Sequence, residues 1–139
     1  ASTCILFSIV CPMPHLILEY SANLDKTLAA ERMVETVHEA AIASGLFPRA
    51  GAKTRAVRQD CYRVANGNPE NAFVHLVARV GRGRSEEELQ RAGDHIFAAL
   101  TEFLDPLYCK RPLAISMEFV EISTWKQNNL RHYLSKDKP

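Results

Sequence analysis

Hydrophobic and polar residues follow two repeat patterns along this chain. Segments with the two-residue alternation of strands are interspersed with segments that have the three-to-four-residue spacing of helices. Apolar residues alternate with polar ones, or run together, in residues 15–21, 54–65, 72–80 and 113–119. Such segments predict β-strands. In residues 25–44 and 85–105, apolar side chains recur at every third or fourth position, which predicts amphipathic helices. The predicted order of elements is therefore β-α-β-β-α-β.

Both predicted helices have start and stop signals. Asp25 can cap the first helix, and Gly45 follows its last turn, where glycine commonly ends a helix. The second helix begins at Ser85, with Glu88 at the spacing of a capping box. We expect this helix to end at Pro106, because the residue before a proline disfavours the helical conformation.

The two halves of the chain are similar to each other. His15-Leu16-Ile17 and His75-Leu76-Val77 lie 60 positions apart, as do the expected helix caps Asp25 and Ser85. Two βαβ units with right-handed crossovers predict an α+β fold, in which one four-stranded mixed sheet carries both helices on one face. The other face keeps apolar side chains with no helix to cover them, so we expect subunits to associate.

Composition and charge narrow the class of protein. A length of 139 residues fits one domain, and a net charge of +1 gives no general attraction to nucleic acid or to an anionic membrane. The four cysteines and five histidines show no spacing typical of a metal site. Reduced cysteines in such a chain favour a cytoplasmic protein.

The first thirteen residues differ from the rest. Residues 4–11 are as apolar as the core of a signal peptide, but no basic residue precedes them and no small-residue cleavage site follows. The run is also far too short to span a membrane. We therefore expect residues 1–13 to be an extension upstream of the functional start, and residues 14–139 to form the working domain.

Pro14 follows Met13 and leads directly into the first predicted strand. A proline can simply open a strand, where its missing N–H costs little. As a free amino terminus it would instead be a secondary amine. The ordinary pKa of an α-amine is about 7.7–8.0, and apolar burial lowers it, which would give a neutral general base. Both interpretations stay open on these residues alone.

Two basic segments are candidates for binding carboxylates. Gly81-Arg82-Gly83-Arg84 lies between a strand and a helix but lacks the third glycine of a dinucleotide loop and the lysine of a phosphate loop. Arg84, at a helix N-terminus, can hold a carboxylate at two points, although a solvated basic turn is the alternative. Lys53 and Arg55 open the second strand, where charges also protect an exposed edge.

Five motifs stand in a fixed order along the chain. They are the Pro14 start, Gly45-Leu46-Phe47-Pro48-x-Ala50-Gly51, Ala72-Phe73-Val74-His75, Gly81-x-Gly83-Arg84-Ser85 and Lys126-Gln127-Asn128-Asn129. Together they resemble the 5-carboxymethyl-2-hydroxymuconate delta-isomerases of the tautomerase superfamily, and the match runs from Pro14 to about Leu134.

The resemblance implies a homotrimer, no cofactor, a small carboxylate substrate and a role in the bacterial breakdown of homoprotocatechuate, an aromatic acid. Carried over by position, Pro14 is the catalytic base and Arg84 a catalytic, carboxylate-binding arginine. Phe47, Lys53 and Arg55 are the expected substrate-binding residues. Lys53 stands where the resemblance leads us to expect arginine, and a lysine lacks the planar fork that holds a carboxylate at two points.

Two functions from other classes remain. One is a ligand-binding βαββαβ module without chemistry, and the other is a structural trimer that has lost activity. Residues 1–13 favour the inactive structural trimer, because a peptide bond to Met13 makes the Pro14 nitrogen an amide. A chemically reactive Pro14 amine would separate the enzyme from both.

Overall fold

The computed structural model describes residues 14–134, and its elements follow the predicted order. The strands are β1 (His15–Ser21), β2 (Lys53–Gln59), β3 (Ala72–Gly81) and β4 (Leu113–Ile122). The helices are the short 3-10 turn η1 (Ala22–Leu24), α2 (Ala30–Ala43), α3 (Glu86–Tyr108) and α4 (Arg131–Leu134). The expected extension, residues 1–13, lies outside the described part.

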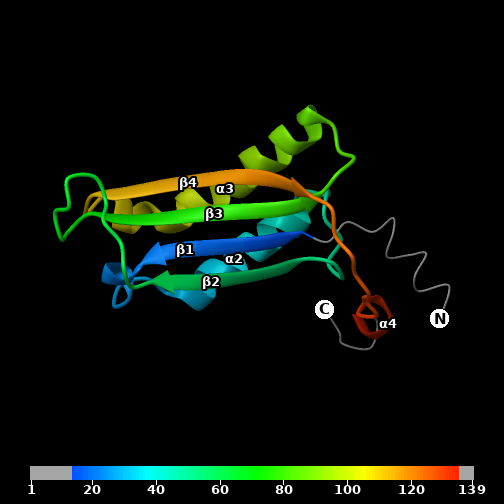
Figure 1. Ribbon diagram of the computed structural model, residues 1–139, viewed down its shortest axis with the longest axis horizontal. Coiled ribbons are helices and arrows are strands. Elements are labelled where there is room, and N and C mark those ends of the chain that lie inside the picture. Colours follow the sequence, from blue (N-terminus) through cyan, green and yellow to red (C-terminus); the bar gives the residue numbers. More distant parts are fainter. Residues whose placement is uncertain (1–13, 135–139) are drawn as a thin grey trace.

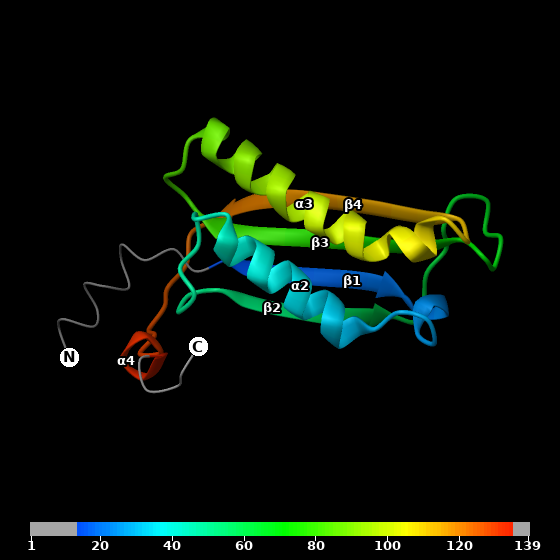
Figure 2. The ribbon, with the colours of Figure 1, turned by 180° about the vertical axis from the view of Figure 1, so that it is seen from behind.

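The four strands form one mixed sheet in the order β2-β1-β3-β4. β1 runs parallel to β2 and antiparallel to β3, and β3 runs parallel to β4. Figures 1 and 2 show α2 and α3 side by side on one face of this sheet. The predicted α+β layers, with both helices on the same face, are therefore confirmed.

The hydrophobic core lies between the sheet and the two helices. Leu16 and Leu18 of β1 and Leu76 of β3 are fully buried on the helix side of the sheet. The apolar stripe of α2 meets them through Met33 and Val37, as the helical spacing predicts. The stripe of α3 does so through its own buried positions, Ala92, Ile96, Leu100 and Leu104. Burial on this face fixes the register of every strand, because a slip of one residue would reverse its faces.

The opposite face of the sheet, which we call the open face, has no helix over it (Figure 1). Side chains alternate between the two faces along each strand. Those on the open face include Ile17, Glu19, Lys53, Arg55, Val57, Phe73, His75, Val77, Arg79, Ser116 and Glu118. Val57 is 41% exposed there. The face thus mixes apolar and charged side chains.

The first helix starts later than predicted, and Asp25 does not cap it. α2 begins at Ala30, and its N-cap residue, Ala29, makes no side-chain capping bond. The preceding turns bring Leu24 and Leu28 into the core. Asp25 instead forms an ion pair with Arg58 of β2, at 2.8 Å. Burial of the two leucines outweighs the local capping preference of Asp25.

The second helix has the predicted start but continues through Pro106. Ser85 and Glu88 form the expected capping box, with both reciprocal hydrogen bonds present. α3 then runs to Tyr108, and the backbone N–H of Cys109 closes the last turn on Asp105. A proline inside a helix loses its own N–H bond, and its ring crowds the carbonyl four residues earlier. Leu107, which packs against the core, holds the final turn in place.

The second strand is shorter than the predicted 54–65. β2 ends at Gln59, and the chain then turns through Ala65 and Gly67, which have positive φ angles of 52° and 85°. In this turn Tyr62 lies edge-on to Phe73, with 6.2 Å between ring centroids. Tyr62 therefore covers the start of β3 rather than extending β2.

Candidate active site

The predicted site residues gather at one end of the sheet, where β1 and β2 begin and β3 and β4 end (Figure 1). Pro14 lies at this end, directly before β1, and its side chain is fully buried. Its carbonyl oxygen accepts a hydrogen bond of 3.1 Å from the backbone N–H of Lys53. This bond continues the parallel pairing of β1 and β2 and fixes the position of the proline.

Arg84 lies over the ring of Phe47, with 5.3 Å from its guanidinium carbon to the ring centroid. It donates hydrogen bonds to the carbonyl oxygens of Gly81 (2.9 Å) and Leu46 (3.4 Å). Phe47 itself is only 2% exposed, so it supports the arginine from below. A guanidinium has five N–H donors, so these two bonds leave others for further hydrogen bonds. The face of the Phe47 ring attracts its positive charge.

The turn that presents Arg84 depends on glycine and on the helix cap. Gly83 has a φ of 113°, in the region that side chains with a Cβ rarely adopt. Ser85, the residue after Arg84, forms the capping box from which α3 begins at Glu86. Burial lowers the pKa of Arg84, while Glu88 and Glu121 oppose that shift. An arginine remains a cation near neutral pH under such a shift.

Lys53 and Arg55 lie on the open face with His15. The Nζ of Lys53 lies 3.4 Å from the carbonyl oxygen of Gly51. Arg55 Nη1 lies 3.2 Å from His15 Nδ1, and a neutral imidazole can accept this bond. The site residues therefore form two groups at the same sheet end, Arg84 with Phe47, and Lys53 and Arg55 with His15.

The cations of this cluster shift one another's titration. Burial, and then the charges of Arg55, Lys53 and Arg79, lower the pKa of His15. Burial and Arg55 also lower the pKa of Lys53. Like charges that lie close together disfavour the protonated forms of their neighbours. The positive charges at this end of the sheet therefore lower the pKa values of the neighbouring basic groups His15 and Lys53.

Sequence reasoning assigned no role to two residues that the structure brings here. His15 contacts Arg55. Asn128, part of the Lys126-Gln127-Asn128-Asn129 motif, donates from Nδ2 to the carbonyl oxygen of Ala50 at 2.9 Å. The position of His15 next to Pro14 could have indicated that it belongs to the site. The contact of Asn128 could not be predicted, because it depends on where the segment after β4 crosses the end of the sheet.

Comparison with known proteins gives the family. The family model of 5-carboxymethyl-2-hydroxymuconate isomerase matches residues 14–134. The 5-carboxymethyl-2-hydroxymuconate Delta-isomerase of Escherichia coli is 35% identical over 127 residues, which cover 89% of this chain and all of that protein. This chain belongs to the 5-carboxymethyl-2-hydroxymuconate isomerase family.

Solved structures of this isomerase family share the fold closely. A 5-carboxymethyl-2-hydroxymuconate isomerase from Deinococcus radiodurans R1 has a TM-score of 0.80 and 36% identity, covering 91% of this chain and 96% of that one. A 5-carboxymethyl-2-hydroxymuconate delta-isomerase has a TM-score of 0.79 and 29% identity, covering 86% and 91%. A fused 4-OT trimer, at 11% identity and a TM-score of 0.59 over 81% and 93%, shares the fold alone.

Residues 14–134 of this isomerase homologue lack two features. Within that range, no cluster of three or more His, Cys, Asp or Glu side chains is arranged to hold a metal ion. Over the same residues, no helix has both the length and the apolar character to cross a membrane.

The lowered pKa of His15 predicts a pH-dependent contribution to stability. As the pH falls, His15 is protonated at a higher pH in the unfolded chain, where its pKa is about 6.5, than in the folded chain. The contribution of His15 to stability is therefore fully present at pH values above the unfolded-state pKa. It is lost as the pH falls through the lower folded-state pKa. We expect wild type to lose more stability than His15→Asn between about pH 7.5 and about pH 5, in urea titrations. Parallel pH profiles for the two proteins would contradict the assignment.

Proposed function

We propose that this protein, when its chain begins at Pro14, is a tautomerase that moves a proton along a conjugated 2-hydroxymuconate-type substrate. The observation that carries the proposal is the fully buried proline at the start of a central strand, at the same sheet end as several cations. Family membership supports a small carboxylate as the substrate class. The free cysteines Cys61 and Cys109 are consistent with work in the cytoplasm, in aromatic-acid breakdown.

In the proposed reaction, the neutral Pro14 amine removes a proton from the dienol, either from the 2-hydroxyl group or from an allylic carbon. The electron pair left on the substrate shifts along the conjugated system towards the carbon that will be protonated, and the 2-hydroxyl oxygen becomes the ketone oxygen. The protonated proline then returns a proton to a carbon further along, which gives the conjugated ketone and restores the amine. One proton leaves the substrate and one returns, so no cofactor is needed.

The surrounding cations supply the conditions for this chemistry. Arg84, supported by Phe47, would hold one carboxylate of the substrate, and Lys53 or Arg55 would hold the other. Of the two residues, Lys53 is the one paired with Pro14, because its backbone N–H donates a hydrogen bond to the Pro14 carbonyl oxygen. The positive charges and burial would also keep the pKa of the proline amine low. Developing negative charge on the substrate oxygen would be stabilised by the same side chains.

A second candidate function is favoured by one observation, the peptide bond between Met13 and Pro14 in the 139-residue chain. In that form the proline nitrogen is a tertiary amide whose lone pair is delocalised. Such a chain would be a non-catalytic ligand-binding or structural member of the family. Removal of residues 1–13 would convert one form into the other.

We predict that the form starting at Pro14 is active as a tautomerase and that the 139-residue form is nearly inactive, because an amide nitrogen is not a usable base near neutral pH. Turnover of one dienol dicarboxylate by both forms, with the intact mass of each checked before and after the assay, decides this. Equal turnover with the extension still attached would exclude Pro14 as the base.

We predict that Arg84→Ala lowers kcat/KM for a dicarboxylate enol by roughly tenfold to over a hundredfold, the loss of a charge-assisted hydrogen bond of about 1.5–3 kcal/mol. Arg84→Lys should recover only part, because it keeps the charge without the fork. Arg82→Ala is the matched control, since Arg82 lies in the same turn but is exposed. Both alanine variants are first compared by thermal unfolding. Unchanged kcat/KM in a folded Arg84→Ala would remove Arg84 from the site.

We predict that the protein is a homotrimer, because the open face carries apolar side chains such as Ile17, Val57 and Val77 with no layer over them (Figure 1). Multi-angle light scattering at micromolar concentration measures the mass directly. A monomer under these conditions would show that the open face is stable in water.

A further inference from the structure

Lys53 lies in a row of basic side chains on the open face. His15 of β1 is paired with Lys53 of β2 on one side and with Arg79 of β3 on the other. Arg55 follows Lys53 by two positions, so it lies on the same face, about 7 Å further along the strand. Three neighbouring strands therefore bring four basic side chains together at the end of the sheet where Pro14 lies.

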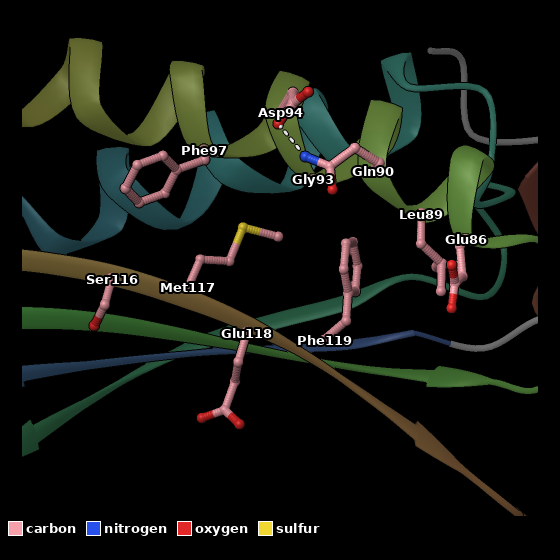
Figure 3. Close-up of a pocket in the computed structure, with 10 residues that line it drawn as sticks. All are labelled: Glu86, Leu89, Gln90, Gly93, Asp94, Phe97, Ser116, Met117, Glu118 and Phe119. Atoms are coloured by element: carbon pink, nitrogen blue, oxygen red, sulfur yellow. Dashed lines mark hydrogen bonds between the residues drawn. The ribbon is translucent and has the colours of Figure 1, made fainter.

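The carboxylates of the open face lie away from Lys53. In the hollow between α3 and β4, Phe119 points towards the helix and Glu118 points to the opposite side, onto the open face (Figure 3). There Glu118 bonds to His75 at 2.7 Å, and its strand forms the sheet edge opposite β2. Glu19 of β1 also lies opposite His75. Within the described part of the chain, Lys53 forms no ion pair, so no carboxylate holds its amine in the charged form.

The surroundings of Lys53 favour the neutral form of its amine. Burial, and then the charge of Arg55, lower its pKa, and its Nζ lies 3.4 Å from the neutral carbonyl group of Gly51. A neutral amine has a free lone pair, and a lysine next to another cationic group is a typical nucleophile towards carbonyl compounds. An arginine, which the resemblance leads us to expect here, keeps its proton and cannot react in this way. The lysine therefore gives this chain a reactive group that the expected arginine would not.

We propose that Lys53 binds 2-oxo carboxylates covalently and reversibly, as an imine between its Nζ and the carbonyl carbon of the ligand. Nζ forms a bond to that carbon, and the two amine protons leave with the carbonyl oxygen as water, so no oxidant or reductant takes part. The carboxylate next to this carbon would lie against the Arg55 guanidinium, which has N–H donors besides the one that approaches His15. Addition of water reverses the reaction and restores the amine.

The binding of 2-oxo carboxylates goes beyond the tautomerase reaction and does not depend on it. The ketone that the proposed tautomerase reaction forms is itself a 2-oxo carboxylate, so it belongs to the same class of ligand. Imine formation uses the Lys53 amine, however, and can therefore occur in the 139-residue chain, where the Pro14 nitrogen is an amide. Failure of either proposal would leave the other standing.

The test uses the 139-residue chain, with pyruvate as the ligand and sodium cyanoborohydride as an added reductant. Hydride transfer from this reductant turns the imine into a secondary amine, and peptide mapping by mass spectrometry locates the modified residue. Near neutral pH, we expect Lys53 to be modified about tenfold or more faster than Lys26, an exposed lysine, because the cations hold the carboxylate beside the amine. Equal rates at the two lysines would overturn the proposal.

Acetone tests whether the carboxylate is recognised. It is a ketone without a carboxylate, so the ratio of the Lys53 rate to the Lys26 rate should fall by about threefold or more when acetone replaces pyruvate. An unchanged ratio would overturn the assignment of 2-oxo carboxylates as the ligands.

Variants of Arg55 test the role of its charge, after thermal unfolding has shown that each variant is folded. Arg55→Gln should slow the modification of Lys53 by about fivefold or more and move its pH profile to higher pH, because a neighbouring positive charge is lost. Arg55→Lys keeps the charge, so it should keep the pH profile and lose part of the rate. Arg32→Gln makes the same change as Arg55→Gln at an exposed position of α2 and should behave as wild type. Identical rates and pH profiles for Arg55→Gln and Arg32→Gln would overturn the proposal.

Discussion

The position of Pro14 depends on the pairing of β1 at the centre of the sheet. β1 bonds to β2 on one side and to β3 on the other, and its helix-side leucines, Leu16 and Leu18, are fully out of water. A strand held in this way cannot slide, because a shift of one residue would place buried leucines on the open face. The residue before the strand is therefore held as firmly as the strand itself. If Pro14 acts as the proposed base, the core preorganises it, and no flexible loop is needed to position it.

The cations at this sheet end are held close together by groups that offset their repulsion. Arg84 rests on the Phe47 ring and on two backbone carbonyls, Lys53 approaches the carbonyl of Gly51, and Arg55 approaches the His15 imidazole. All of these partners are neutral. Glu88 and Glu121, which act to raise the pKa of Arg84, offset only part of the positive charge, and the remainder would attract an anionic substrate.

In the proposed site, the lysine at position 53 would affect which substrate is held more than the kind of reaction. A lysine offers a compact charge in place of a planar fork, so it fixes the direction of a carboxylate less strictly than an arginine does. Arg55, two residues later on the same face, carries the fork but is turned to His15. An exchange of partners between His15 and a substrate carboxylate would bring Arg55 into use.

The sequence by itself determined the layers of the fold and the order of its strands and helices along the chain. Periodicity located all four strands and both long helices, and the Ser85 capping box was readable because its two bonds are local. The resemblance singled out Pro14 and Arg84. Tertiary structure decided what local signals could not. Asp25 gave up its capping role when Leu24 and Leu28 entered the core, and α3 continued past Pro106 because Leu107 packs beneath it. The contacts of His15 with Arg55 and of Asn128 with Ala50 join residues 40 and 78 positions apart, and only the folded chain brings such residues together.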